Sequence, residues 1–377
     1  MRHFETIETL YQKLVTNTTY EANYHFLSQR YRLCTSREEI IKYTDRFMNH
    51  YRVTEGSNTS LITIYASDQV DTKPFQKALD SREVFSMHIG KGDRWNMNAK
   101  SMDVSTWLVI YLLNTGTIFL INRIKRVAII LGSMDSFLKE DVFHLIRSVM
   151  CRSAEVQGYS IYHAAGVVLN GKGILIVGES GRGKTTTFLE LIQAGSKPVS
   201  NDRVFIKDKD GPLQMHEWPS FVNTSVGTIQ KMPQMRHLLP ENLTFDSLEE
   251  LWHSKIKLPI EPPDFCEMFQ VRYQPQHTID LIVFPFLKPE HTFSTIKPIC
   301  IDEAYRLFEE SCYTPDDPAY LNWHRFVPLD SQVLRDQSQR ITERLLKEVP
   351  CFRLEGGPSL QDAVGLISKK LYSGVGQ

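Results

Sequence analysis

The stretch Gly173-Ile-Leu-Ile-Val-Gly-Glu-Ser-Gly-Arg-Gly-Lys-Thr185 decides the fold prediction for this chain. The apolar run Ile174 to Val177 predicts a buried strand, and Thr186 to Ala194 predict the helix that follows. Between them lies the G-x-x-x-x-G-K-[ST] pattern of a P-loop, also called Walker A. Strand, glycine-rich loop and helix in this order are the context that the motif requires. We therefore expect an α/β unit that binds nucleotide phosphates.

The glycine-rich loop predicts a cradle of backbone amides around phosphate oxygens, at the head of the following helix. We expect Lys184 to reach the β- and γ-phosphates and Thr185 to offer its hydroxyl to Mg²⁺. A chance glycine turn is the alternative, and the flanking strand and helix disfavour it. The predicted nucleotide-binding residues are Gly178, Glu179, Ser180, Gly181, Arg182, Gly183, Lys184, Thr185 and Thr186.

Bulk composition limits the other possibilities. The chain has 377 residues, of which 42% are hydrophobic and 23% charged, and a formal net charge of −1, as is ordinary for a globular protein of two domains. The lack of a basic surplus disfavours nucleic acid as a partner. The sequence shows no secretory signal and no run of roughly 18 apolar residues, so we expect no membrane contact and a cytoplasmic location. Six scattered cysteines predict reduced thiols, with a structural zinc or a redox pair as alternatives.

Residues 1–155 predict an α+β accessory domain without a catalytic constellation. Residues 1 to about 50 have helical spacing, and short strands are expected over 61–65 and 84–89. A hairpin over 107–113 and 117–122 would continue into a strand over 127–131, and a helix over 137–157 would end the domain. We expect this domain to recognise a substrate or to mediate self-association as a homo-oligomer.

Residues 156–377 predict the P-loop domain. From Ile161 onward the expected order is strand, strand, P-loop, helix, strand and hairpin. Residues 219–263 predict loops and short helices, and a strand is expected over 279–286. Further on we expect a helix capped by Asp302, a helix over 339–347, a strand over 351–354, and a last helix opened by Ser359.

Two polar residues near the predicted loop are candidates for catalysis. Asp202 follows Lys184 by 18 residues, which is one helix plus one short connection, so its carboxylate can return beside the phosphates. There it could act as a general base or as a Mg²⁺ ligand; an ion pair with Arg203 or a turn cap is the alternative. His163 ends the strand beside the P-loop strand and could donate to a γ-phosphoryl oxygen, or could simply be a satisfied core histidine.

The motifs Tyr162-His-Ala-Ala-Gly-Val-Val, Gly-Glu-Ser-Gly-Arg-Gly-Lys-Thr-Thr and Ser200-Asn-Asp-Arg-Val, in this order and spacing, resemble the HPr kinase/phosphorylase family. That family shares its P-loop core with ATP-dependent phosphoenolpyruvate carboxykinases. The resemblance covers about residues 161–206 strongly and the rest of the domain loosely. It implies an HPr-kinase-like fold, ATP with Mg²⁺, and a serine or threonine hydroxyl as acceptor. By motif matching it gives His163, Lys184 and Asp202 catalytic positions, and Thr185 and Asp202 the metal positions.

Departures from the family pattern bear on the substrate. Family members commonly carry two aspartates where this chain has Asn201-Asp202, and the Glu-x-Arg-Gly segment is replaced by His216-Glu-Trp-Pro-Ser. These differences put HPr protein and the reverse reaction in doubt. The Trp-Pro segment and the ending Val349-Pro-Cys-Phe-Arg-Leu354 look more like HPr-kinase-related enzymes of peptide modification, including lasso-peptide kinases. Weaker candidates are Glu217 as a second carboxylate and Lys255 or Arg272 as phosphate ligands.

Three functions follow as hypotheses. The first is an ATP-dependent kinase acting on a hydroxyl of a peptide or small molecule. The second is a non-catalytic nucleotide-binding module that recruits a peptide or a partner enzyme, and Asn201 in place of a carboxylate is its main support. The third is a carboxykinase acting on a dicarboxylic acid, which would need lysine and histidine metal ligands that the sequence does not reveal.

Overall fold

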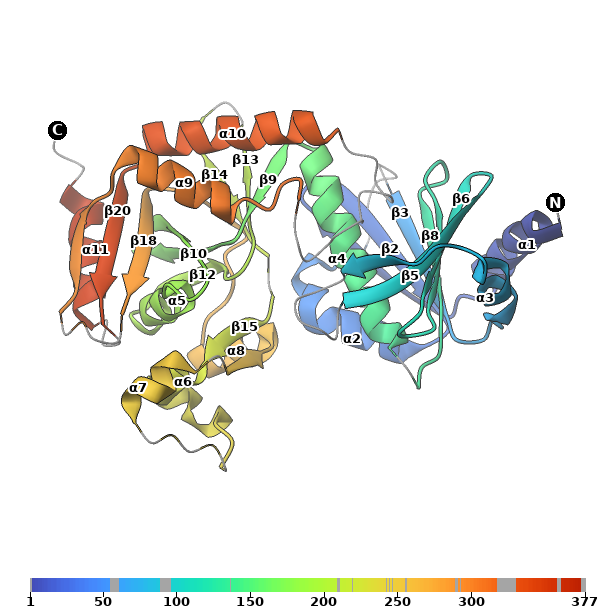
Figure 1. Cartoon of the computed structure of the whole chain (residues 1–377), viewed down its shortest axis with the longest axis horizontal. Helices are drawn as coiled ribbons and strands as arrows, with labels where there is room; N and C mark the ends of the chain where they lie inside the picture. Colours follow the sequence, from blue (N-terminus) through green and yellow to red (C-terminus); the bar gives the residue numbers. More distant parts are fainter. Residues whose placement is uncertain are drawn as a thin grey trace. The chain divides into compact units, whose positions relative to one another are not determined.

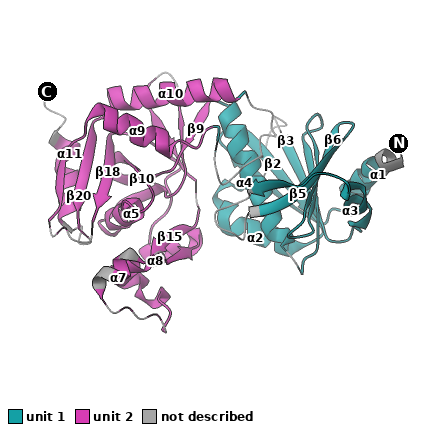
Figure 2. Cartoon of the chain, in the orientation of Figure 1, with its two compact units in different colours: residues 1–157, 315–330 teal, residues 158–314, 331–377 magenta. Residues whose placement is uncertain are grey.

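A computed structural model of the chain divides into two compact units (Figures 1 and 2). The first unit comprises residues 1–157 and 315–330, and the second comprises 158–314 and 331–377. The division at residue 157 lies two residues beyond the expected boundary, but the inclusion of 315–330 in the first unit was not foreseen. The structure describes residues 2–54, 61–88, 96–135, 137–208, 211–218, 220–241, 243, 245, 247–254, 256–288, 291, 293–316, 330–357 and 361–373.

The first unit is built on one eight-stranded mixed sheet in the order β1-β2-β3-β8-β7-β6-β5-β4. Strands β2, β3 and β8 run parallel, and the other neighbours are antiparallel. Its elements are α1 (Arg2–Thr16), β1 (Tyr20–Phe26), β2 (Gln29–Thr35), α2 (Glu38–Met48), a 3₁₀ turn (Asn49–Tyr51), β3 (Leu61–Ser67), α3 (Lys73–Leu79), β4 (Phe85–His88), β5 (Asn96–Val104), β6 (Trp107–Leu112), β7 (Ile118–Asn122), β8 (Val127–Leu131) and α4 (Leu138–Val156).

Helices cover both faces of this sheet, which explains why β7 and β8 are buried at every residue. Val127, Ile129 and Leu131 pack with residues of α1 and α3. The predicted hairpin and the following strand are confirmed as β6, β7 and β8. The expectation that residues 1 to about 50 are helical is wrong between α1 and α2, where β1 and β2 form a hairpin. The reason is a period of two in β1, whose alternate residues Ala22, Tyr24 and Phe26 are buried.

The second unit contains a six-stranded sheet in the order β12-β10-β11-β18-β20-β19, a four-stranded antiparallel sheet β17-β14-β13-β9, and the pair β15-β16. Its elements are β9 (Tyr159–Tyr162), β10 (Ala164–Leu169), β11 (Lys172–Val177), α5 (Lys184–Gln193), β12 (Lys197–Ser200), β13 (Val204–Lys207), β14 (Gln214–His216), β15 (Val222–Ser225), α6 (Val226–Lys231), a 3₁₀ helix (Pro233–Leu238), α7 (Leu248–His253), β16 (Lys257–Ile260), α8 (Pro262–Phe269), β17 (Gln276–Thr278), β18 (Leu281–Leu287), β19 (Thr295–Pro298), α9 (Ile301–Ser311), α10 (Ser331–Glu348), β20 (Cys351–Gly356) and α11 (Gln361–Ser373).

The six-stranded sheet lies between two apolar layers, so the run Ile174 to Val177 is buried on both faces. Ile174 and Ile176 pack with α5 and α11, whereas Leu175 and Val177 pack with α9 and α10. Parallel pairing of β11 with β18 and of β18 with β20, with helices on both faces, confirms the α/β class (Figure 1). The expected order is confirmed from the P-loop strand onward, as β11, α5, β12 and the pair β13-β14, but three strands instead of two lead up to the loop. His163 does not end the strand beside the P-loop strand, because it lies between β9 and β10, and β10 begins at Ala164.

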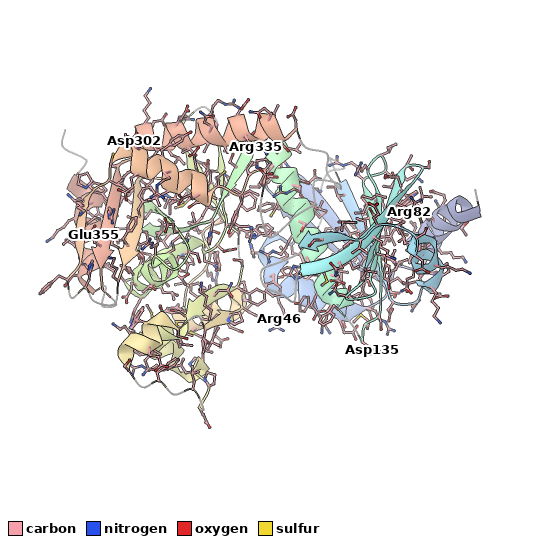
Figure 3. The ribbon with its side chains drawn as sticks, in the orientation of Figure 1. Arg46, Arg82, Asp135, Asp302, Arg335 and Glu355 are labelled. Carbon is pink, nitrogen blue, oxygen red and sulfur yellow. The ribbon has the colours of Figure 1, made fainter. Side chains whose placement is uncertain are left out.

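Details at helix ends differ from expectation. Cys300, not Asp302, occupies the N-cap position of α9 and makes no side-chain capping bond, whereas Asp302 lies in the first turn (Figure 3). Helix α10 begins at Ser331, earlier than expected, because its first turns expose most of their side chains and so lack an apolar period. Ser359 lies outside the described residues. None of the six cysteines, all of which lie among the described residues, forms a disulfide.

Candidate functional site

The site is organised by one edge of the six-stranded sheet. Strand β10 lies between β11 and β12 and is antiparallel to both, with Ala164 opposite Val177 and Gly166 opposite Ser200. The carboxyl ends of β11 and β12 therefore meet the amino end of β10. His163, the P-loop and Asp202 directly adjoin these three strand ends. Two strand spacings, roughly 10 Å, separate β11 from β12.

The P-loop connects β11 to α5 through backbone that only glycine tolerates. Gly178, Gly181 and Gly183 have positive φ. Gly183 precedes α5 in the left-handed region, and a Cβ there would lie 2.5 Å from the side chain of Leu287. The backbone N–H of Leu287 donates to the carbonyl of Arg182 at 3.1 Å, which ties the loop to the end of β18. The loop therefore delivers the amino end of α5, with its free amides and partial positive charge, to the sheet edge.

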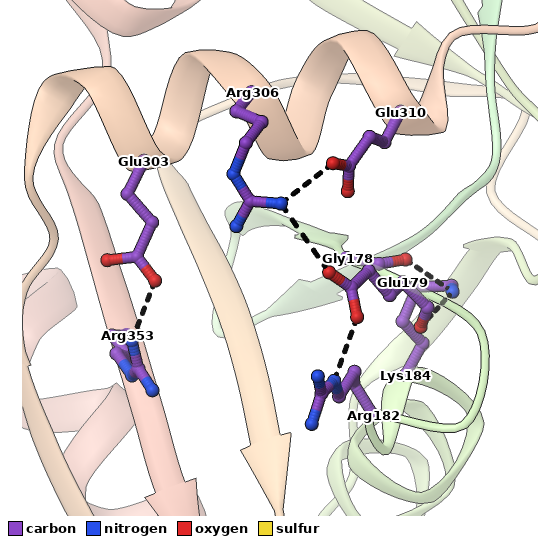
Figure 4. A network of polar contacts seen from close by, with 8 residues as sticks. All are labelled: Gly178, Glu179, Arg182, Lys184, Glu303, Arg306, Glu310 and Arg353. Carbon is purple, nitrogen blue, oxygen red and sulfur yellow. Dashed lines mark hydrogen bonds and ion pairs between the residues drawn. The ribbon is translucent and has the colours of Figure 1, made fainter.

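Lys184 folds back over the loop that precedes it. Its Nζ donates to the carbonyl oxygens of Gly178 at 2.6 Å and Glu179 at 3.0 Å (Figure 4). Thr185 is half-buried beside it, whereas Ser180 and Gly181 are exposed at the loop tip. The ammonium group is thus held inside the loop, where phosphate oxygens would meet it.

The side chain of Thr186 faces away from the loop. Its hydroxyl shares a hydrogen bond of 2.9 Å with Thr228 of α6, and both residues are buried. The predicted contribution of Thr186 to nucleotide binding can then come only from its backbone N–H, which lies in the first turn of α5. The side-chain bond instead fastens α5 to the segment that follows β15.

Glu179 pairs with Arg182 within the loop and with Arg306 of α9 (Figure 4). Arg182 Nε donates to Glu179 Oε2 at 2.9 Å, and Arg306 Nη1 lies 3.7 Å from Glu179 Oε1. Arg306 also pairs with Glu310 at 2.7 Å. The hydrogen bond from Arg182, followed by the two positive charges, lowers the pKa of Glu179. Because these groups are partly exposed, each pair contributes little to stability.

Asp202 lies between a histidine and an arginine. Its Oδ1 is 3.6 Å from His163 Nε2, and its Oδ2 accepts a hydrogen bond from Arg203 Nη1 at 2.7 Å. Arg203 is 4% exposed, whereas His163 and Asp202 remain about a fifth exposed. The ion pair that the sequence offered as an alternative is therefore present, and His163 contacts the same carboxylate. The arginine orients one oxygen and leaves the other toward the histidine.

Tyr313 supports this group and was missed by sequence analysis. Its ring lies parallel to the His163 ring, with centroids 5.3 Å apart, and the Arg203 guanidinium lies 5.0 Å from its centroid. The backbone N–H of His163 donates to Ser311 at 2.7 Å, and that of Tyr313 donates to Ile161 at 2.8 Å. The segment after α9 is thereby held against the end of β9. No local pattern could reveal a contact between residues so far apart in sequence.

Asn201, which occupies the position of the missing aspartate, bridges neighbouring loops. Its Nδ2 donates to Ser220 Oγ at 3.2 Å and to the Phe221 carbonyl at 3.0 Å, and its Oδ1 accepts from the Tyr273 hydroxyl at 3.1 Å. The amide uses both of its ends in these bonds. Asn201 therefore orders the loops that surround Asp202.

Glu217 is a buried carboxylate in the same neighbourhood. It is 7% exposed, and burial raises its pKa to about 7. The next residue, Trp218, pairs with Ser200 at the end of β12, and Ser200 Oγ donates to the Trp218 carbonyl at 3.2 Å. Glu217 is thus fixed near the strand end that carries Asp202. A cation at the site would favour its ionised form.

The other candidates are less informative. Arg272 is exposed on the connection after α8, and Lys255 lies outside the described residues. The described residues contain no cluster of three or more histidine, cysteine, aspartate or glutamate side chains able to hold a metal. Among the described helices, none combines the length and apolarity needed to span a bilayer.

Comparison with known proteins gives a partial relationship. No family model matches the chain. It is 55% identical over 51 residues to the HPr kinase/phosphorylase of Clostridium beijerinckii, a match that covers 14% of this chain and 17% of that protein. It is 38% identical over 61 residues to the HPr kinase/phosphorylase of Lactiplantibacillus plantarum, covering 16% and 19%. The chain therefore matches less than a fifth of the length of these curated relatives.

Among solved structures, the HPr(Ser) kinase/phosphatase of Coxiella burnetii matches 37% of this chain and 77% of its own, with 18% identity and a TM-score of 0.22. A TM-score this low does not establish a shared fold. The relationship rests on the sequence matches, and these confirm the predicted resemblance: in a short segment, the chain is related to the HPr kinase/phosphorylases.

Proposed function

We propose that the second unit is an ATP-dependent kinase that transfers the γ-phosphate to a serine- or threonine-type hydroxyl of a peptide or small molecule. The observation that carries the proposal is the shared sheet edge, because β10 and its two neighbours bring His163, the P-loop and Asp202 together. The sequence relationship to HPr kinase/phosphorylases supports the same reaction class. The first unit would then be an accessory domain for substrate recognition or self-association.

The residues present fit the triphosphate of ATP. Because Gly183 has no Cβ, the loop backbone packs directly against Leu287 without a clash. The Lys184 ammonium is already held in the loop by the carbonyl oxygens of Gly178 and Glu179. Phosphate oxygens would replace those carbonyls as acceptors from Lys184. The amides at the start of α5 would donate to the same oxygens.

The residues also fit Mg²⁺ of the kind that accompanies a nucleotide. Magnesium in such sites is held by one or two protein groups together with phosphates and water. Thr185 and Asp202 are the proposed ligands, with Glu217 as a further carboxylate. When bound, Mg²⁺ would neutralise charge on the phosphate oxygens.

Asp202 is the proposed base for the acceptor hydroxyl. As the hydroxyl oxygen bonds to the γ-phosphorus, its proton would pass to an Asp202 oxygen, and the bond between the γ-phosphorus and ADP would break. Arg203 would hold the carboxylate in place, and His163 would donate to a phosphoryl oxygen. Lys184 would stabilise the charge that develops on the transferred group.

The acceptor is proposed from sequence resemblance. The segment from His216 to Ser220 and the ending 349–354 resemble peptide-modifying relatives, including lasso-peptide kinases. A serine-bearing peptide, such as a ribosomally made natural-product precursor, is therefore the first substrate class to test. A cytoplasmic location without nucleic-acid or membrane partners is proposed with it.

The alternative is a nucleotide-binding module without phosphotransfer. Asn201 favours it, because an amide that orders loops has taken the place of a second acid. Against it, Lys184, Thr185 and Asp202 are all retained at the sheet edge. A carboxykinase activity has no comparable support.

Transfer of label from γ-³²P-ATP separates these functions. The full chain is incubated with Mg²⁺ and candidate serine peptides, beside an Asp202→Asn variant and a control variant, Asp336→Asn, on the exposed face of α10. The kinase predicts transfer by wild type and control, and its loss in Asp202→Asn. Nucleotide binding without transfer in any variant would favour the binding module.

A further inference from the structure

The first unit contains a cavity that the proposed kinase does not use. It has a volume of about 280 Å³ and lies at the carboxyl ends of β2 and β3, beneath the last turns of α1. These two strands are parallel, with Thr35 paired to Ala66. The volume is near the lower limit of ligand pockets, about 300 Å³, and the carboxyl ends of parallel strands are where α/β sheets commonly bind ligands. A small molecule is therefore the occupant that the cavity suits.

Hydroxyl groups at the two strand ends have equivalent settings. Thr35 Oγ1 accepts from the backbone N–H of Arg37 at 3.1 Å, and Ser67 Oγ accepts from that of Gln69 at 3.2 Å. Among the described residues neither hydroxyl donates a hydrogen bond, so its hydrogen is available for donation to a ligand. Both residues are buried and line the cavity.

Ser36 supplies a third hydroxyl to the lining. Its Oγ is buried and has no hydrogen-bond partner among the described residues. A buried polar atom in this state costs about 1–3 kcal/mol, and such atoms are rare enough in native proteins to need an explanation. A ligand acceptor in the cavity supplies one.

The charge around the cavity favours an anion. Lys13 of α1 is the one cationic side chain in the lining as described, and no carboxylate lines it. Burial raises the pKa of Cys34 and of Tyr65 to about 12, so both are neutral near pH 7. Two carboxylates lie nearby, and each is paired with an arginine: Asp68 with Arg37 at 2.7 Å, and Glu21 with Arg32 at 3.2 Å. One lysine and three hydroxyl-bearing residues thus line the cavity, and its lining as described holds no carboxylate.

We propose that this cavity binds a small organic anion. Its carboxylate or phosphate group is held by Lys13 and by the hydroxyls of Thr35, Ser36 and Ser67. Its apolar part lies against the apolar side chains of the lining, among them Leu10, Leu14 and Val70. The site is contained in the first unit, so it does not depend on the kinase proposal. The competing explanation is a gap left by loose packing of α1, which would have no preference for anions.

Ligand-observed NMR titration of the full chain tests the proposal. Hexanoate and hexyl phosphate represent the two anionic groups, with hexanol and hexylamine as neutral and cationic analogues of the same chain length. The protein carries Lys184→Ala, which removes the P-loop lysine as a second anion site. We expect at least one anion to bind about tenfold or more tightly than the analogues. Equal binding of all four, or no binding of either anion up to its solubility limit, overturns the proposal.

Substitutions in the same background locate the bound anion. Lys13→Gln and Ser67→Ala are each expected to raise the dissociation constant of the bound anion about tenfold, whereas Lys77→Gln, an exposed control on α3, leaves it unchanged. Lys13 is itself exposed, so its replacement leaves the fold intact even if Ser67→Ala does not. Unchanged affinity in Lys13→Gln, or an equal loss in Lys77→Gln, would place the anion elsewhere.

Discussion

Both units place polar side chains at the carboxyl ends of parallel strands, but they use different means. In the second unit, a glycine-rich loop and a lysine follow β11, and Asp202 follows β12. In the first unit, the ends of β2 and β3 carry hydroxyls in short turns without a glycine-rich loop, and α2 begins at Glu38, just after the cavity residue Ser36. The comparison teaches that parallel strand ends can form a site with or without a contiguous motif. Only the first kind is visible in a sequence.

Removing the lysine of the motif should have the largest effect. We expect Lys184→Ala to lower phosphotransfer about 10³-fold, because it removes a charged donor aimed at the transferred group. The measurement is label transfer from γ-³²P-ATP, with Lys347→Ala on the exposed end of α10 as the control. Full turnover in Lys184→Ala would show that the P-loop lysine has no role in catalysis. The strand ends of the second unit would then not differ from those of the first unit in this respect.

The second difference between the two units is that the P-loop needs glycine at particular positions. Gly183→Ala should cost about 3 kcal/mol, since it combines a strained left-handed φ with a clash against Leu287. Gly181→Ala should cost about 1 kcal/mol, because its φ is positive but no atom lies within 4 Å of the added Cβ. Urea unfolding and nucleotide affinity measure both. Equal costs for the two variants would mean that Leu287 simply moves aside.

The support of His163 by Tyr313 should have a smaller effect. Tyr313→Leu removes the ring that lies against His163 and Arg203. We expect about a tenfold lower kcat, roughly 1.4 kcal/mol, with KM for ATP unchanged, and recovery in Tyr313→Phe. A rise in KM without a fall in kcat would assign the ring to substrate binding instead of to positioning.

Buried polar groups in the first unit should show the smallest effect. Burial raises the pKa of Asp141 in α4 to about 7, although the Thr117 hydroxyl donates to it at 2.5 Å. Its native pKa exceeds the unfolded value of 3.8, so its contribution to stability is complete below that value and is lost as pH rises through about 7.

Between pH 6 and pH 8 this loss should be about 1 kcal/mol. Asp141→Asn keeps an acceptor for Thr117 and removes the titration, so its unfolding free energy should change less over the same interval. Urea unfolding of the full chain at both pH values provides the measurement. Parallel pH profiles for wild type and variant would contradict the assignment.

The parts of the fold that sequence predicted are those with local causes. The expected strand over 174–177 is contained in β11, and the expected helix over 186–194 overlaps α5. Asp202 was predicted to return to the loop from its distance along the chain, and β12 ends two residues before it. Where a motif is flanked by apolar runs, the strand and helix on either side of it can be predicted from the same stretch of sequence.

The remainder depended on contacts between distant residues. Arg306 of α9 and Tyr313 just after it contact Glu179 and His163 although they lie far from these residues in sequence, and neither belongs to a motif. The first hairpin was missed because alternation in β1 is short and lies between two helices. The cavity in the first unit is built from three separate segments, so no spacing in the sequence indicates it.

The β10–β11 hairpin has a consequence for how this protein can change over time. A two-residue turn, Asn170-Gly171, joins the strands at the end opposite the site, and Ala164 to Leu169 pair one to one with Val177 to Lys172. The number of residues in the two strands therefore sets the distance between His163 and the P-loop. A single insertion within either strand would move its inward side chains to the opposite face of the sheet. A longer turn would leave the pairing of the two strands unchanged. Insertions and deletions acquired during evolution should therefore occur at the turn and not within the strands.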